Sequence, residues 1–119
     1  MKTSTSQAIC TDTLDTDLAG MKSNLIDIGI ANRLAEVFKA LSDPTRLRLI
    51  SLLLDHEVCV HSLADTMQMS PSAISHQLRF LRQLRLVRHR KAGRHVFYAL
   101  DDDHIRALFV QGIDHVQHK

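Results

Sequence analysis

The chain contains few of the residues and patterns that mark secreted or membrane-spanning proteins. Its 119 residues include only two cysteines, which cannot form a disulfide framework. Cys10 and Cys59 are therefore expected to be free thiols or metal ligands in a reducing compartment. No uninterrupted apolar run is long enough for a transmembrane helix, and the N-terminus has no apolar signal-peptide core. These absences predict a cytoplasmic protein without a membrane partner.

Signals of an enzyme are also missing. The sequence has no glycine-rich phosphate-binding loop, and no recognisable nucleophile accompanies its eight histidines. We therefore expect no catalytic activity.

Acidic residues are absent from one long stretch. Between Ser70 and Leu100 there is no Asp or Glu, although the net charge of the chain is only +2. The same stretch carries seven cations, namely Arg79, Arg82, Arg85, Arg88, Arg90, Lys91 and Arg94. A basic block between acidic flanks is typical of nucleic-acid binding, although a solvated basic face is the alternative.

A helix over residues 70–84 is predicted at the start of this basic stretch. Ser70 is a good N-cap, and Pro71 suits the first helical position. An apolar stripe follows at helical spacing, formed by Ile74, Leu78, Leu81 and Leu84. The other face carries groups that can reach phosphates and base edges, namely Ser72, Ser75, His76, Gln77 and Arg79. An ordinary amphipathic surface helix is the alternative interpretation.

The flanking segments place this helix in a winged helix-turn-helix. Residues 58–67 are predicted to form a short helix, followed by a tight turn at residues 68–70. Strand-like segments at residues 86–90 and 95–100, joined by a turn at Gly93, predict a β-hairpin. Lys91 and Arg94 at its tip could contact phosphates or a minor groove. The expected fold class is mainly α with a small β-hairpin.

The rest of the chain divides into an arm and further helices. Residues 1–23 are predicted to be a flexible N-terminal arm, and residues 24–119 a DNA-binding and dimerisation domain. Helices are expected at residues 24–41, 44–55 and 102–117, with the second central to the core. The last helix has an apolar face that a complete winged domain would leave uncovered. A partner chain is the expected cover, which gives a dimer formed through the terminal helices.

Five segments together resemble the ArsR/SmtB family of metal-sensing winged-helix repressors. They are FKALSDPTRLRLISLL, CVHSLA, SPSAISHQLRFLRQLRLV, GRHVFYAL and DDDHIRALF, in this order between Leu34 and His118. The resemblance implies a homodimer that binds double-stranded operator DNA. It also implies repression of metal-efflux or metal-sequestration genes that ends when metal binds.

The terminal helix carries four candidate zinc ligands. His104 and His115 are eleven residues apart, a rise of about 16 Å along one helix. Zinc holds nitrogen and oxygen ligands at about 2.0–2.2 Å, so one straight helix cannot bring both to one ion. Two antiparallel helices could, with Asp102 and His104 of one chain facing His115 and His118 of the other. This spacing predicts two equivalent intersubunit sites.

The same four positions match the family's terminal-helix zinc site, with one departure. The family pattern is Asp, His, His and usually a carboxylate, whereas His118 occupies the last position here. An imidazole also ligates zinc. The alternative is that these residues are only the polar face of a surface helix.

A second candidate site contains Cys59, His61 and Cys10. Thiolates and imidazole suit zinc, with cadmium or lead as further candidates. The family has a second type of site here, built from a Cys-X-Cys pair and arm cysteines, whereas this chain has Cys-Val-His and one arm cysteine. A fourth ligand is unassigned, and Asp12, Asp15 or water could serve. The alternative is a buried Cys59 and an unrelated Cys10.

The sequence thus predicts a metal-responsive repressor that binds operator DNA as a homodimer and is released by zinc. The second hypothesis is a winged-helix repressor that senses thiol oxidation through Cys10 and Cys59. A third is a metal buffer or carrier that does not regulate DNA, which the acid-free basic stretch argues against. The sequence gives neither the operator nor the regulated genes, and it does not rank the metals.

Overall fold

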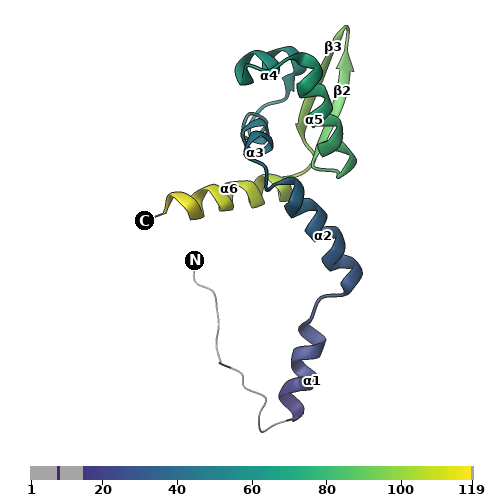
Figure 1. The fold of residues 1–119 in the computed structure, drawn as a ribbon, viewed down its shortest axis with the longest axis vertical. Helices are drawn as coiled ribbons and strands as arrows, with labels where there is room; N and C mark the ends of the chain where they lie inside the picture. Colours follow the sequence, from purple (N-terminus) through teal and green to yellow (C-terminus); the bar gives the residue numbers. More distant parts are fainter. Residues whose placement is uncertain (1–7, 9–14, 119) are drawn as a thin grey trace. The chain divides into compact units, whose positions relative to one another are not determined.

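The computed structural model describes Ala8 and residues 15–118, so Cys10 lies outside the described residues. Backbone contacts divide the chain into two compact units, residues 1–35 and residues 36–119. The order of the elements is α1 (Asp15–Asn24), α2 (Ile28–Ala40), α3 (Pro44–Ser51), β1 (Val58–Cys59), α4 (Val60–Met67), α5 (Pro71–Gln83), β2 (Val87–Ala92), β3 (His95–Leu100) and α6 (Asp103–Gln117) (Figure 1).

The first unit contains helix α1 and the beginning of α2. Helix α1 departs from the expected flexible arm over residues 1–23, because Asp15–Asn24 are helical. A single helix was expected over residues 24–41, but residues 25–27 are not helical and α2 begins only at Ile28. The Asp27 carboxylate accepts hydrogen bonds from the backbone N–H groups of Gly29 (2.9 Å) and Ile30 (3.3 Å), which caps α2 at its start.

The core of the second unit is built around α3. Asp43 caps this helix by accepting a hydrogen bond from the N–H of Arg46, and Pro44 takes the first turn. Leu49 and Ile50 are fully buried, which confirms the predicted central position of this helix. The helix ends at Ser51 rather than at Asp55, and residues 52–57 form the connection to β1.

A helix-turn-helix follows. Helix α4 ends at Met67, and the left-handed backbone of its C-cap Gln68 (φ 58°) turns the chain toward α5. Ser70 caps α5 as predicted, since its hydroxyl accepts a 3.0 Å hydrogen bond from the N–H of Ala73. The predicted apolar stripe of α5 is buried in the core at Ile74, Leu78 and Leu81.

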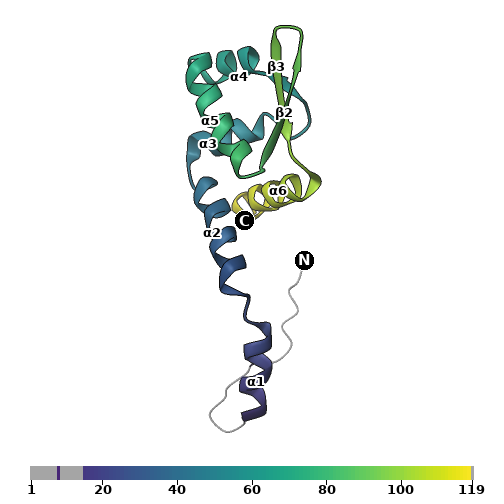
Figure 2. The ribbon, with the colours of Figure 1, turned by 90° about the vertical axis from the view of Figure 1, so that its right-hand side faces the viewer.

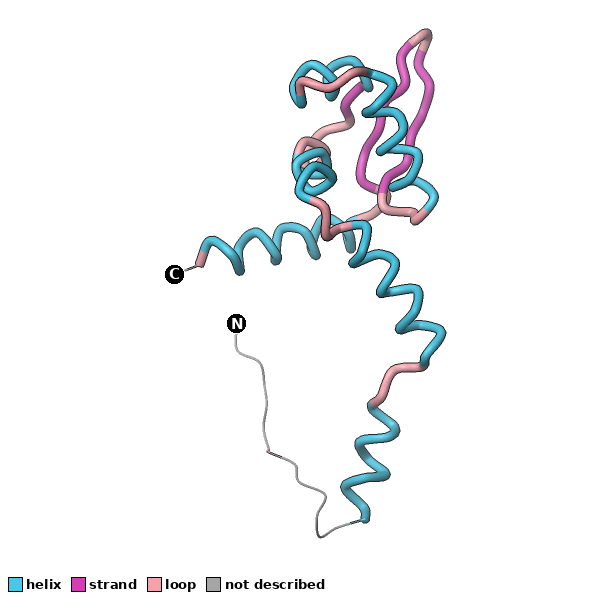
Figure 3. Tube along the Cα trace, viewed as in Figure 1, coloured by secondary structure: helices cyan, strands magenta, loops and turns pink. Residues whose placement is uncertain are grey.

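The sheet has three strands instead of the expected two. Strand β3 lies between β1 and β2, and both pairings are antiparallel (Figures 2 and 3). Val58 and Cys59, expected at the start of a helix, pair with Tyr98 and Phe97 of β3 instead. The predicted β2–β3 hairpin is confirmed, and Gly93 occupies a positive φ of 64° in its turn.

Helix α6 covers the core only in part. Asp102 caps it through a 3.1 Å hydrogen bond from the N–H of Ile105. Ile105 and Phe109 pack against the core, but no residue of this helix is fully buried, and Val116 remains 78% exposed. An apolar groove of about 370 Å³ is lined by residues of α6 and α3 with Leu41. Within the described residues, no helix has the length and apolarity needed to span a membrane.

Candidate nucleic-acid interface and metal-ligand clusters

Most of the predicted DNA-contacting side chains of α5 lie on its solvent side. Ser72, His76 and Arg79 are exposed, and Ser75 is half-buried. The buried stripe on the opposite face fixes the rotation of the helix, so these side chains are presented together. Their roles on DNA remain predictions.

Gln77 is held differently from its neighbours. Its side-chain oxygen accepts a 3.0 Å hydrogen bond from Nε of Arg46 in α3. The Arg46 guanidinium also lies 4.3 Å from the ring centre of Phe80 and donates to the backbone oxygen of Ala40 (3.4 Å). Arg46 therefore anchors α5 to α3, a role that the helix-start pattern around it did not reveal.

A hollow of about 280 Å³ separates α5 from the wing formed by β2 and β3. Ser75, Arg79 and Lys91 contribute to its lining, together with Arg82 and His89, which were not predicted as site residues. Nη1 of Arg82 lies 2.6 Å from Nε2 of His89, and the His89 ring stacks on Tyr98 with centroids 5.5 Å apart. A guanidinium only donates, so the imidazole nitrogen is the acceptor of this hydrogen bond.

The seven cations of the acid-free stretch serve different purposes. Arg88 donates to the backbone oxygen of Leu100 (2.6 Å), and Arg90 forms an ion pair with Glu57 (2.8 Å). Lys91 and Arg94, in contrast, are exposed beside the hairpin turn and make no described ion pair. The exposed cations of this stretch without a described ion pair are therefore Arg79 on α5, Arg85 just after it, and Lys91 and Arg94 at the end of the wing.

Asp102 and His104 lie close enough to share one metal ion. Oδ2 of Asp102 is 3.6 Å from Nδ1 of His104, and the His104 side chain is 94% exposed. Two ligand atoms at about 2.1 Å from a tetrahedral zinc ion lie about 3.4 Å apart, so the observed pair fits zinc. The capping hydrogen bond from Ile105, and then His104, lower the pKa of Asp102, which favours its ionised form.

The other two predicted ligands of this site lie at the far end of α6. His115 is exposed in the last helical turn, and His118 follows the helix as its C-cap, with its N–H bonded to the oxygen of Asp114. Within the described part of one chain, no three potential ligands come together around a common point. One chain thus pairs Asp102 with His104 but leaves both apart from His115 and His118.

Cys59 occupies the junction between β1 and α4. Its Sγ lies 3.3 Å from the hydroxyl of Ser62, and hydrogen bonding to Ser62 lowers the pKa of the Cys59 thiol. His61 is exposed in the next turn, with its ring 6.4 Å from that of His95. Because Cys10 lies outside the described residues, the structure leaves this second site as a prediction.

Comparison with known proteins identifies the family. Residues 43–89 match the family described as bacterial regulatory protein, arsR family. A transcriptional repressor SmtB homolog of Synechocystis is 46% identical over 97 residues, covering 82% of this chain and 74% of the relative. A cadmium resistance transcriptional regulatory protein CadC homolog of Staphylococcus aureus is 40% identical, covering 83% of this chain and 76% of the relative.

Solved structures agree with the fold. The structure of apo-NmtR is 38% identical, covers 80% of both chains and gives a TM-score of 0.70. The homodimeric winged helix-turn-helix DNA-binding domain Mb0332 of Mycobacterium bovis is 27% identical with the same TM-score, covering 77% of this chain and 89% of that one.

Proposed function

Because the chain belongs to the arsR family of bacterial regulatory proteins, we propose that it is a metal-responsive repressor released from operator DNA by zinc. As a member of this family it is a winged helix-turn-helix transcriptional regulator and not an enzyme. The nature of the signal, the ligands that receive it and the direction of the response belong to the proposal.

The DNA-binding half of the proposal rests on α5 and the wing. In a homodimer, two copies of α5 would enter successive major grooves of an inverted-repeat operator. Arg79 is the leading candidate for base contacts, and Ser72, Ser75 and His76 could reach bases or phosphates. While Arg46 holds its side-chain oxygen, Gln77 can offer a base or phosphate only its amide N–H groups. Lys91 and Arg94 would contact phosphates beside the groove.

The sensing half rests on one observation, the 3.6 Å approach of Asp102 to His104 at the start of α6. Two ligands complete only half of a tetrahedral zinc site. His115 and His118 of the partner subunit would supply the other half if the two α6 helices pack antiparallel. The incompletely buried apolar face of α6 supports such packing, because a second copy would cover it.

Two protomers joined in this way would couple metal to DNA. Ligands held across the two-fold axis fix the distance between the two copies of α5, so a metal-bound dimer can fit the operator poorly. The coupling is reciprocal, and operator DNA weakens metal binding by the same factor. Metal-free protein is therefore the form that represses.

Cys59 supports a second, weaker metal site. A thiol with a lowered pKa loses its proton more readily than an ordinary thiol, and thiolates bind zinc, cadmium and lead. His61 and the arm residue Cys10 would complete the donor set, with a fourth ligand unassigned. Cadmium or lead bound here would extend the response beyond zinc.

The proposal is tested by fluorescence anisotropy with DNA from upstream of the protein's own gene. Zinc should weaken operator binding by about 5- to 150-fold, the usual size of allosteric coupling, and chelation should restore it. His104→Ala should bind the operator as wild type does but lose the zinc response. Gln111→Ala, an exposed non-ligand on the same helix, is the matched control.

The outcomes separate the competing functions. DNA binding that ignores zinc but is lost on peroxide treatment, and is insensitive to peroxide in Cys59→Ser, would favour thiol sensing. Zinc binding without any operator binding would favour a metal buffer. Loss of operator binding in metal-free His104→Ala would make His104 a structural residue and contradict the proposed site.

A further inference from the structure

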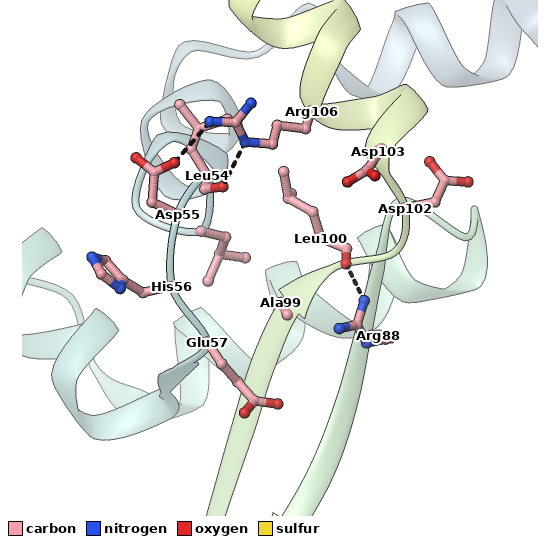
Figure 4. A pocket seen from close by; sticks show the side chains of 11 residues that line it. Leu54, Asp55, His56, Glu57, Arg88, Ala99, Leu100, Asp102, Asp103 and Arg106 are labelled. Carbon is pink, nitrogen blue, oxygen red and sulfur yellow. Dashed lines mark hydrogen bonds and ion pairs between the residues drawn. The ribbon is translucent and has the colours of Figure 1, made fainter.

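The connection between α3 and β1 is held from both sides by arginines of other elements. On one side Arg106, from the first turns of α6, donates through Nε to the backbone oxygen of Leu54 (3.1 Å). Nη2 of Arg106 also forms an ion pair with Oδ1 of Asp55 (2.8 Å). Figure 4 shows Arg106 reaching from α6 to these two residues. The start of α6 is thereby attached to the connection.

The other side of the same connection is attached to the wing. Arg90 of β2 binds Glu57 with both arms of its guanidinium, at 2.9 Å from Nε to Oε2 and 2.8 Å from Nη2 to Oε1. Such a two-point contact fixes orientation as well as distance. The Arg90 guanidinium also stacks over Phe97 of β3, 4.8 Å from its ring centre. Lys91, a predicted phosphate contact, is the next residue along β2.

We propose that the pairs Arg106–Asp55 and Glu57–Arg90 form a mechanical link that transmits movement of the α6 start to the wing. Arg106 follows Asp102 by one helical turn, and its backbone N–H donates to the backbone oxygen of Asp102 (3.5 Å). A shift of Asp102 and His104 on binding metal therefore displaces Arg106. The displacement reaches Glu57 through Leu54 and Asp55, and Arg90 then repositions the wing. These are positioning residues, and the inference rests on the proposed function.

Arg88 makes a second contact between β2 and the residues that lead into α6. Nη1 of Arg88 donates to the backbone oxygens of Leu100 (2.6 Å) and Asp101 (3.3 Å), at the exit from β3 toward α6. Arg88 and Arg90 thus hold the same strand at two points, one directly beside the start of α6 and one through the connection.

The link predicts a role in coupling and only a small role in stability. Ion pairs this exposed contribute little to folding, because water screens them. Their geometry nevertheless determines where the wing lies, and coupling between sites depends on such discrete contacts. The measurement must therefore follow the wing and the metal response rather than the melting temperature.

The first test needs no metal. In NMR spectra of the full-length protein, the Nε–Hε signal of Arg90 reports its hydrogen bond to Glu57. Arg106→Gln and Asp55→Asn should each shift this signal and speed its exchange with water. Arg48→Gln, which removes an equal charge from an exposed position without a described ion pair, should leave it unchanged. An Arg90 signal that is identical in wild type and Arg106→Gln overturns the link.

The second test measures the ratio of operator affinities without and with zinc. Arg106→Gln, Asp55→Asn and Glu57→Gln should each reduce this ratio by about three- to tenfold. The double variant of Asp55 and Arg106 should lose no more than either single variant. Glu36→Gln is the control for Glu57→Gln. An unchanged ratio in all three variants overturns the link.

The two tests also separate this inference from the proposed function. Wild-type protein that ignores zinc contradicts the proposed function, and the link is then decided by the Arg90 signal. Wild-type protein that responds to zinc while the variants respond equally contradicts the link and leaves the proposed function in place.

Discussion

Helices α5 and α6 are similar in length but differ in how far this chain completes their surroundings. Helix α5 has 13 residues and buries Ile74, Leu78 and Leu81 completely. Helix α6 has 15 residues and buries none. The exposed side of α5, which carries the predicted DNA contacts, is thus displayed by a core that one chain provides. Helix α6 has an apolar face without full cover, and its candidate metal ligands are separated at its two ends. In the proposed function, DNA binding therefore depends on surroundings that one chain completes, whereas the metal site depends on a second chain.

The largest effect that tests this difference is on folding. Leu78→Ala should lower the free energy of unfolding by about 2–5 kcal/mol, because it leaves a cavity among fully buried neighbours. Leu108 of α6 is 41% exposed, so Leu108→Ala should cost far less in the monomer but weaken dimerisation. Denaturant unfolding at low protein concentration measures the first effect, and sedimentation equilibrium measures the second. Equal losses of monomer stability would contradict the distinction.

The next effect is on DNA affinity. Arg79→Gln should weaken operator binding by about 1–3 kcal/mol and relax discrimination at one base position. Lys91→Gln should weaken binding to all sequences similarly and reduce the salt slope of log K by about 1. Anisotropy titrations on operator and scrambled DNA at several salt concentrations separate the two. Neither change should alter the affinity of the metal-free protein for zinc.

The fold of the DNA-binding half could be predicted from the sequence because its signals are local. Ser70 and Pro71 mark the start of α5, the period of Ile74, Leu78 and Leu81 gives its buried face, and Gly93 marks the hairpin turn. Strand β1 was missed because two residues, Val58 and Cys59, carry no period and are defined only by their pairing with β3.

Neither the cap of α2 nor the hydrogen bonds between residues far apart in the chain were predicted from the sequence, for different reasons. The Asp27 cap of α2 had a readable signal, an acidic residue just before an apolar periodic run. The bond from Arg46 to Gln77 spans 31 residues and that from Arg90 to Glu57 spans 33, and no local pattern announces either. The candidate metal ligands follow from residue type, spacing and the family resemblance, and the structure adds the 3.6 Å approach of Asp102 to His104.

A smaller effect concerns the reactivity of the Cys59 thiol in the second candidate metal site. Removing the Ser62 hydroxyl should raise the pKa of the Cys59 thiol, because the hydrogen bond from Ser62 is the main cause of its lowering. Ser62→Ala should therefore react more slowly with iodoacetamide at pH 7 and bind cadmium less tightly at that pH. The comparison is made in a Cys10→Ser background, so that only one thiol reports. Thr66→Ala, one turn further along α4, is the control.

The smallest effect is the pH dependence contributed by Glu57. Its ion pair with Arg90 lowers the pKa of the Glu57 carboxyl in the folded protein. An unpaired glutamate titrates at about 4.3, so the stabilisation is fully present above that pH and disappears as the pH falls through the folded value. Glu57→Gln should be slightly less stable than wild type at pH 7, and the difference should vanish in acid. Glu36→Gln should show no such trend in urea unfolding from pH 7 to pH 3. A difference that persists in acid would mean that Glu57 stabilises the fold through something other than its charge on Arg90.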